Sequence, residues 1–525
     1  MASLAASASY DETKKDAGDF APDSLSTPPQ PVHNEELEKM RRKERLSSTF
    51  TVICAGFALI SDGLQNNIMT LTNVVLGQIY GKKYTASIST RLSNSLTVGT
   101  ILGQLAIGVV CDLYGRKHGI VISTFAIVAG IIIVTAAHGA HGSLSGFFWC
   151  FTVGRGLTGV GVGGEYPSSS ASAAEAANEK MVKQRGPVFI LVTNLVLSFG
   201  TIFACILYLI VFEAAGGIHA NLNTVWRVVF GISLLPPLIV FIFRMRMLNS
   251  QLYRKGAVQS GVPLRLTVKY YWKSLIGTAG AWFLYDSDTI YSCCKRPQHP
   301  QLTFYLSIQN GVFSGTIIAS LVKVKGEELI RKTAEWQLLL GVIALPGVFV
   351  GAALCNRIGR RNTMIFGFSG YLIIGLIVGC AYDKVTKIVP LFIILYGLMQ
   401  SFGNAGPGDM LGLTSSESYA TAVRGTCYGF SAAIGKVGAV VGNQTFTPIK
   451  VHLGQKYTFI VAACAGVLGM IVTYFFIRND LGGDLADEDA RFAAYLESQG
   501  WTGHIGVKGT EALIDEEDSV IKSKQ

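Results

Sequence analysis

Five ionisable side chains lie inside apolar runs of this sequence. Arg155 and Glu165 bound the glycine-rich stretch RGLTGVGVGGE, Asp62 lies in GFALISDGLQNN, Asp286 follows AWFLY, and Lys436 lies in SAAIGKVGAVVG. Ionisable residues are costly inside a membrane and usually mark a substrate or proton pathway. A cavity that holds Arg155 and Lys436 suits an anion, and Arg suits bidentate contact with a phosphate. A dehydrated carboxylate takes up a proton more readily, so the three acids can bind and release protons.

The elements that position these charges follow from the composition. The chain has 525 residues, of which 50% are hydrophobic and 15% are charged, and its mean hydropathy is +0.41. Soluble domains carry roughly 25% charged residues. The composition therefore indicates an integral membrane protein. The net charge of +10 is spread over loops without a basic aromatic platform, which argues against nucleic-acid binding.

About twelve apolar runs are long enough to cross a bilayer as helices, which takes about 20 residues each. Helices are expected because backbone groups in lipid must be satisfied within the segment. The sequence thus predicts an all-α membrane protein. The runs cover 49–72, 91–111, 118–137, 145–168, 187–212, 226–245, 337–355, 363–380, 389–405, 426–446 and 457–477, with one more inside 273–322.

One loop pattern occurs twice at corresponding places, as GVVCDLYGRKHG at 108–119 and GAALCNRIGRRN at 351–362. The repeat predicts two pseudo-symmetric halves of six helices each, and it resembles the signature loop of the major facilitator superfamily. Asn356 stands where the first copy has an acid. Charges at these helix ends are expected to form a latch that breaks as the halves rock. The latch residues are Asp112, Gly115, Arg116, Lys117, Arg360 and Arg361.

Lys and Arg concentrate in alternate loops, which places both termini in the cytosol. The predicted domains are a disordered cytosolic tail at 1–47, an N-terminal half at 48–245, a cytosolic interdomain loop at 246–272, a C-terminal half at 273–477 and a cytosolic tail at 478–525. Residues 486–498 are expected to form a surface helix. Glu175 and Glu179 are interpreted as solvated residues of the loop after the fourth helix.

Arg155 and Glu165 would lie about 15 Å apart along one helix, so each needs a partner elsewhere. A buried structural ion pair is the alternative to a pathway for both. The glycines between them allow a neighbouring helix to approach closely.

The stretches GGEYP, WFLYD, GNAGPGDMLGLTSSESYATAVRGT and AAIGKVGA resemble the fungal phosphate and glycerophosphodiester proton symporters, over about residues 48–478. The resemblance implies proton-linked acids at Asp62, Glu165 and Asp286. It implies substrate contacts from Arg155, Tyr166, Trp282, Asn404 and Lys436.

The fifth helix reads FILVTNLVLSFG and lacks the glutamine of inorganic phosphate carriers, with Asn194 nearby. This departure favours the glycerophosphodiester branch, such as glycerophosphoinositol uptake by proton-coupled alternating access. An inorganic phosphate symporter, a sugar porter and a non-transporting nutrient sensor remain alternatives. The resemblance implies a carrier rather than an enzyme, without cofactor or metal, that is a monomer in the plasma membrane. Its expected partners are protons, a small phosphate-containing anion and lipid.

Residues 287–304, SDTIYSCCKRPQHPQLTF, interrupt the predicted seventh helix with charges and two prolines. Deleting them would restore one span of ordinary length with Asp286 near its middle. They are interpreted as a retained intron or a lineage-specific insertion. The alternative is a loop that leaves 274–285 at the interface and moves Trp282 and Asp286 away from the pocket.

Overall fold

In the computed structural model, the described residues are 57, 59–244, 262–287, 318–319, 321, 326–452, 455–501 and 503, and every regular element among them is a helix. The predicted all-α fold is confirmed for this part of the chain. The tail at 1–47 and residues 288–304 of the interrupting segment lie outside the described residues.

The helices of the first half follow the predicted runs in order. They are α2 (Ile60–Tyr80), α3 (Ala86–Leu113), α4 (Arg116–Thr135), α5 (Leu144–Met181), α6 (Arg185–Ala214), α7 (Leu222–Ile232) and α8 (Leu235–Arg244), with 3-10 turns η1 (Gly81–Lys83), η2 (Ala140–Gly142), η3 (Val182–Gln184) and η4 (Gly217–His219).

The second half repeats the pattern with more interruptions. Its helices are α10 (Leu264–Ser287), α12 (Glu327–Ala344), α13 (Pro346–Leu354), α14 (Arg360–Cys380), α15 (Tyr382–Val385), α16 (Val389–Gly403), the π-helical η5 (Asn404–Gly408), α17 (Asp409–Glu417), α18 (Arg424–His452), α19 (Gln455–Phe476) and α20 (Leu485–Ser498). The predicted surface helix at 486–498 is confirmed as α20.

Seven stretches of the described chain are long and apolar enough to cross a membrane. The helices α2, α5, α10 and α18, which carry the charges singled out in the sequence, are not among the seven. Their charged and polar side chains lower their hydropathy.

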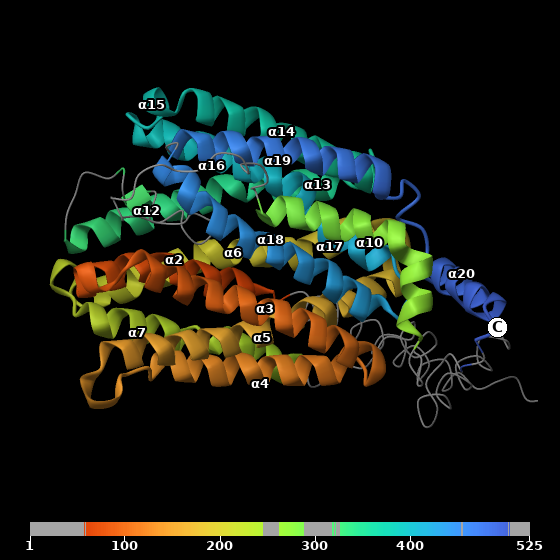
Figure 1. Ribbon diagram of the computed structural model, residues 1–525, viewed down its shortest axis with the longest axis horizontal. Coiled ribbons are helices and arrows are strands. Elements are labelled where there is room, and N and C mark those ends of the chain that lie inside the picture. The colour runs from red at the N-terminus through yellow and green to blue at the C-terminus, as the bar shows by residue number, and fades with distance from the viewer. Residues whose placement is uncertain are drawn as a thin grey trace, which may run out of the picture. The chain divides into compact units, whose positions relative to one another are not determined.

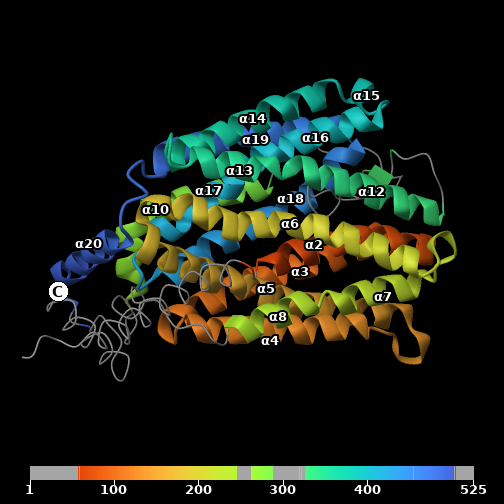
Figure 2. The same ribbon diagram turned by 180° about the vertical axis from the view of Figure 1, so that it is seen from behind.

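Glycines set the packing of α5 against α3 and α4, which lie beside it in Figures 1 and 2. A Cβ on Gly159 would lie 2.1 Å from the carbonyl oxygen of Leu96, and one on Gly163 would lie 2.2 Å from that of Thr100. Only glycine permits this distance, so the glycine-rich stretch of α5 is a packing surface. Figure 1 also shows α14, α16 and α19 gathered on the opposite side of the bundle.

The two signature loops have the same backbone form. Gly115 between α3 and α4 has φ +101°, and Gly359 between α13 and α14 has φ +84°. Positive φ favours glycine, so both copies need glycine at the same place in the turn. The repeat found in the sequence is therefore also a repeat in the structure.

Two helices of the second half break beside each other. One break separates α12 from α13 at Leu345, and the other is η5, which contains Pro407. The Asn404 side chain donates to the carbonyl oxygen of Ala344 at 3.0 Å and joins the two breaks. The tenth predicted helix, 389–405, is formed by α16, η5 and α17 in succession. It ends at Glu417 instead of residue 405.

Helix α10 has 24 residues and begins at Leu264, inside the segment that was predicted as the interdomain loop at 246–272. The apolar run from Ser274 to Tyr285 suggested a shorter helix, because Arg265, Lys269 and Lys273 precede it. Lys and Arg near one end of a membrane-spanning helix can extend their charged groups toward the membrane–water interface. The 274–285 segment is thus part of a helix of full length.

Candidate functional site

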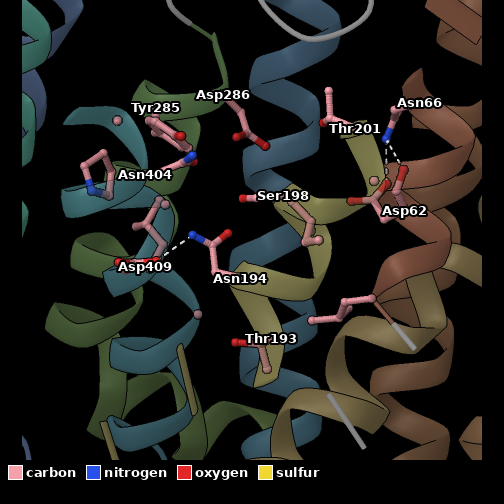
Figure 3. A pocket seen from close by; sticks show the side chains of 18 of the residues that line it. Asp62, Asn66, Thr193, Asn194, Ser198, Thr201, Tyr285, Asp286, Asn404 and Asp409 are labelled. Carbon is pink, nitrogen blue, oxygen red and sulfur yellow. Dashed lines mark hydrogen bonds between the residues drawn. The ribbon is translucent and has the colours of Figure 1, made fainter. Parts of the chain in front are cut away.

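A cavity of about 320 Å³ lies between helices of both halves. Among the described residues that line it are three carboxylates, Asp62, Asp286 and Asp409, and one ammonium group, Lys436. Figure 3 shows Asp62 on one side of this cavity and Asp409 on the other, with Asp286 between them toward the top of the view. The helices α2, α10, α17 and α18 supply these four charges.

Lys436 and Asp286 form an ion pair, with 3.2 Å between Nζ and Oδ2. The centroid of the Tyr166 ring lies 5.8 Å from Lys436 Nζ, which adds a weak cation–π contact. Trp282, one turn before Asp286 on α10, packs edge-on against Tyr428 with 5.6 Å between ring centroids. The cavity therefore holds a cation that already has a counter-ion.

Asp62 lies on α2 and is only 4% exposed. Its carboxylate accepts a short hydrogen bond from the Tyr166 hydroxyl and another from Asn66 Nδ2 at 2.6 Å. The hydroxyl of Tyr166 thus binds the Asp62 carboxylate, and its ring faces the Lys436 ammonium group.

The sequence did not single out Asp409, although it lies on the cavity wall and is only 2% exposed. Asn194 Nδ2 of α6 donates to Asp409 Oδ1 at 2.6 Å, a bond that Figure 3 shows crossing between the halves. The quoted motif GNAGPGD contains Asp409, so an acid directly after a proline-broken helix was an available signal.

Neutral hydrogen-bonding groups make up most of the remaining polar lining. In the part of the chain that the structure describes, six amides and six hydroxyls of Ser and Thr line the cavity, namely Asn66, Asn67, Asn194, Gln337, Gln400, Asn404, Thr97, Thr100, Ser170, Thr193, Ser198 and Thr201. Such a wall suits a ligand with several hydroxyl groups.

Of the predicted site residues, Tyr166, Trp282 and Asn404 line the cavity together with Asp62, Asp286 and Lys436. The alternative that moves Trp282 and Asp286 away from the pocket is therefore wrong for this structure. Arg155 and Glu165 are not among the lining residues, although both are buried.

Arg155 lies behind the cavity wall rather than on it. Its Nη1 donates to the backbone oxygen of Gln65 at 3.0 Å and to Gln65 Oε1 at 3.3 Å. The guanidinium also interacts electrostatically with Asp62. Its position supports an influence on Asp62, while a direct substrate contact would need Arg155 to reach the cavity.

Two charge clusters join the halves at one end of the bundle, called here the charged end. The first cluster consists of Asp112, Arg116, Glu175 and Arg424. Arg116 bonds Asp112 at 2.6 Å and Glu175 at 2.8 Å, and Arg424 bonds the same Glu175 oxygen at 2.9 Å. Asp112 also accepts from the backbone nitrogens of Gly425 at 2.9 Å and Thr426 at 2.6 Å, so it caps α18 of the other half.

The second cluster consists of Asn356, Arg360, Glu417 and Arg185. Glu417 accepts from Arg185 at 2.8 and 3.1 Å and from Arg360 at 3.1 and 3.2 Å. Arg360 also donates to Asn356 Oδ1 at 2.8 Å. Each half contributes an arginine to the cluster of the other half, since Arg185 starts α6 and Arg424 starts α18.

The other predicted latch residues differ in their contacts. Gly115 shapes the turn, Lys117 is exposed, and the Arg361 guanidinium lies 5.2 Å from the ring centroid of Tyr474. Glu175 was expected to be solvated but is fully buried, because α5 continues through an alanine-rich stretch to Met181. The ion pairs of Glu175, Arg185, Glu417 and Arg424 were not predicted.

No group of three His, Cys, Asp or Glu side chains that could hold a metal ion occurs in the part of the chain that the structure describes.

Comparison with known proteins gives consistent results. The family described as "Sugar (and other) transporter" matches residues 48–256 and 305–489. Glycerophosphoinositol permease 1 of Candida albicans is 48% identical over 92% of this chain and 90% of its own length. Glycerophosphoinositol transporter 1 of Saccharomyces cerevisiae is 47% identical over 92% of this chain and 88% of its own length.

The fold resembles that of the major facilitator superfamily proton:xylose symporter XylE. The TM-score is 0.66 at 16% sequence identity, over 85% of this chain and 99% of that chain. This likeness concerns the fold alone. The family match omits residues 257–304, which include the whole of the proposed insertion.

Proposed function

Because the chain belongs to the sugar (and other) transporter family, we propose that it imports a glycerophosphodiester, such as glycerophosphoinositol, together with protons. The two yeast relatives support this substrate by their names and by their coverage of nine-tenths of this chain. The chain is a multi-pass membrane transporter and not an enzyme. Its place in the plasma membrane, its cytosolic termini and its monomeric state are parts of the proposal.

The observation that carries the proposal is the Lys436–Asp286 ion pair in the cavity. A phosphodiester anion needs the Lys436 ammonium, which Asp286 occupies. A proton on Asp286 removes the competing charge and leaves Lys436 to the phosphate. Binding of the anion and of the proton thereby support each other, which is what coupling requires.

The charge of the cavity supports proton uptake more generally. Three carboxylates and one ammonium among the described lining residues sum to −3 + 1 = −2 when all are ionised. An anion would be repelled from such a cavity until protons neutralise part of that charge. A neutral sugar would need no such neutralisation.

We assign the roles of the predicted residues accordingly. Lys436 holds the phosphate, with Tyr166, Trp282 and Asn404 as further substrate contacts and Arg155 acting from behind the wall. Proton coupling falls to Asp62, Glu165 and Asp286.

We propose that the latch works at the charged end, which faces the cytosol. Opening there requires Arg424 to leave Glu175, and Arg185 to leave Glu417, as the halves separate. The bonds within one half, such as Arg116–Asp112, can persist during this motion. The latch thus favours one access state without locking it.

The neutral lining supports an ester that also carries a polyol. The amides and hydroxyls of the described lining offer acceptors to the hydroxyls of glycerol and inositol, and those whose hydrogens are not bonded within the protein offer donors as well. Free inorganic phosphate would leave most of them without a ligand contact. This difference supports the glycerophosphodiester over the inorganic phosphate alternative.

Uptake by purified protein in liposomes tests the proposal. Labelled glycerophosphoinositol should accumulate inside when the outside is made acidic, and a protonophore should abolish the accumulation. Unlabelled glycerophosphoinositol should compete more strongly than inorganic phosphate or xylose. Stronger competition by inorganic phosphate or xylose would mean that glycerophosphoinositol is not the preferred substrate. Binding without uptake would indicate a sensor. A matched control is Asp383→Asn, which removes an exposed acid outside the cavity.

The interrupting segment 287–304 needs a separate test. If it is a retained intron or an insertion that impairs the seventh helix, the chain without these residues should transport better than the full chain. Sequencing of mature transcripts decides the origin, since the intron hypothesis fails if every transcript encodes the segment.

A further inference from the structure

Asp409 has a single, neutral partner among the described residues, unlike the other two cavity acids. Asp62 accepts from Tyr166 and Asn66, and Asp286 is paired with Lys436. Asp409 accepts one hydrogen bond, from the neutral amide of Asn194. In the described part of the chain, no donor reaches its Oδ2 and no cationic nitrogen lies within 4.0 Å of it. An ionised carboxylate in such a place is strongly disfavoured.

The surroundings of Oδ2 suit a proton. A Cβ on Gly351 of α13 would lie 1.9 Å from Asp409 Oδ2 and 2.5 Å from the backbone oxygen of Ala405. The two oxygens therefore border the same small space, which the missing side chain of Gly351 leaves. Two acceptors repel each other there, whereas a protonated carboxyl could donate toward the carbonyl.

The charged and titratable groups on the elements that pack against α17 leave Asp409 without a counter-ion. Cys355, at the end of α13, interacts electrostatically with Asp409. Lys436 of α18 is paired with Asp286 of α10. Glu165 of α5 is buried outside the cavity lining. Tyrosines line the cavity from α5, α10, α14 and α18, as Tyr166, Tyr285, Tyr371 and Tyr428. The remaining charges of α5, α6, α14 and α18 near α17 gather at the charged end, as Glu175, Arg185, Arg360 and Arg424.

Two bonds connect the same pair of helices, α6 and α17. Arg185 bonds Glu417 at the charged end, and Asn194 bonds Asp409 at the cavity. If the proposed latch opens by separating α6 from α17, both bonds break in one motion. Asp409 then loses its amide donor and gains water.

We propose that Asp409 is a further proton-binding site of the transport cycle. It holds a proton on Oδ2 while the charged end is closed. When α6 separates from α17, the O–H bond breaks, the proton passes to water at the charged end, and the carboxylate remains. This inference rests on the proposed proton-coupled transport and adds Asp409 to its path.

Asp409→Asn tests the proposal because it keeps the shape and fixes the neutral state. In liposomes, the ratio of protons to glycerophosphoinositol is measured from the membrane potential that stops net flux. The ratio should fall by about one proton per substrate, while exchange of substrate at equal concentrations stays within about twofold of wild type. Asp383→Asn, which removes an exposed acid outside the cavity, should leave both values unchanged.

The outcomes separate the two proposals. If wild type shows no proton-driven uptake, the proposed function fails. If wild type shows it and Asp409→Asn has the wild-type ratio and the wild-type pH profile, only the role of Asp409 is overturned. If Asp409→Asn does not reach the membrane, Asp409→Glu replaces it. That variant should keep the wild-type ratio with a displaced pH profile, and an undisplaced profile would count against the proposal.

Discussion

The two clusters at the charged end are built from corresponding residues but differ in charge. The first cluster pairs two arginines, Arg116 and Arg424, with two acids, Asp112 and Glu175. The second pairs Arg185 and Arg360 with one acid among the described residues, Glu417. The difference arises at one position of the repeated loop, where Asn356 stands in place of Asp112.

The second cluster compensates in two ways for the acid that Asn356 replaces. Glu417 accepts four hydrogen bonds from two guanidinium groups through both of its oxygens, while Arg116 and Arg424 both donate to Oε1 of Glu175. The tail helix α20 also contributes Asp484, which accepts from Asn178 at 2.8 Å, and Asn178 in turn accepts from Arg185.

This comparison teaches that the halves close by different means. The first cluster has two carboxylates for its two arginines, and Asp112 also caps a helix of the other half. The second cluster shares one carboxylate between its two arginines, while the tail reaches both clusters, through Asp489 near Arg424 and through Asp484 at Asn178. Removal of single acids should therefore affect the two clusters unequally.

The largest effect is expected from Glu417→Gln. The substitution leaves two buried guanidinium groups without their shared counter-charge, and breaking a buried ion pair costs about 3–5 kcal/mol. We expect a lowered Tm in detergent and a large loss of uptake. Thermal unfolding of the purified protein measures the first effect.

Glu175→Gln is the matched control in the first cluster. Asp112 still pairs with Arg116, and Asp489 lies 4.0 Å from Arg424, so we expect a loss of about 2 kcal/mol. Equal losses of Tm for the two variants would show that the clusters are equivalent after all.

Much of the fold could be predicted because apolar length and charge bias are local properties of the sequence. The helices from α3 to α6 follow their apolar runs, and the repeated glycine turn identified the two halves. Hydropathy failed where a helix continues past its apolar part. Helix α5 extends to Met181 through alanines, which favour a helix, and α17 extends to Glu417.

A middle-sized effect is expected from Asp112→Asn, which gives the first cluster the residue of the second. The amide keeps one acceptor for α18 but loses the charge toward Arg116 and one of the backbone bonds. Charge-assisted hydrogen bonds contribute about 1.5–3 kcal/mol, and we expect a loss in that range. Thermal unfolding and uptake both report it.

The reciprocal Asn356→Asp sharpens the comparison. The new carboxylate would strengthen the contact with Arg360 but would lose the bond from Asn356 Nδ2 to the backbone oxygen of Lys183. Because Asn356 is exposed, we expect a change within about 1 kcal/mol. A stabilisation as large as the loss in Asp112→Asn would mean that burial does not matter here.

The site was only partly predictable, since sequence shows which residues are charged but not which helix faces they share. Asp62, Asp286 and Lys436 lie in one cavity because α2, α10 and α18 face it. Arg155 and Glu165 have the same intramembrane signal but lie behind the wall. Asp409 was missed because its partner, Asn194, is 215 residues away in the other half.

The smallest effect is expected from Asp484→Asn at the N-cap of α20. Asn178 and the backbone nitrogen of Ala486 hold the pKa of the Asp484 carboxyl below its usual value of 3.8, and Arg185 adds to this. A carboxyl whose pKa is lowered by folding stabilises the protein above its usual pKa, and this contribution is lost as the pH falls through the lowered value. Asp484 is exposed, so water screens the interaction and we expect a loss of about 0.5 kcal/mol at neutral pH.

Asp487→Asn, in the first turn of the same helix, removes an exposed acid for which no side-chain partner is seen among the described residues, and it controls for the helix dipole. Unfolding measured from neutral pH into acid should show the difference between wild type and Asp484→Asn shrinking as the pH falls below 3.8 and vanishing below the lowered pKa of Asp484. If the stability difference persists in acid, or if Asp487→Asn loses as much stability, Asp484 does not stabilise the second cluster through its charge.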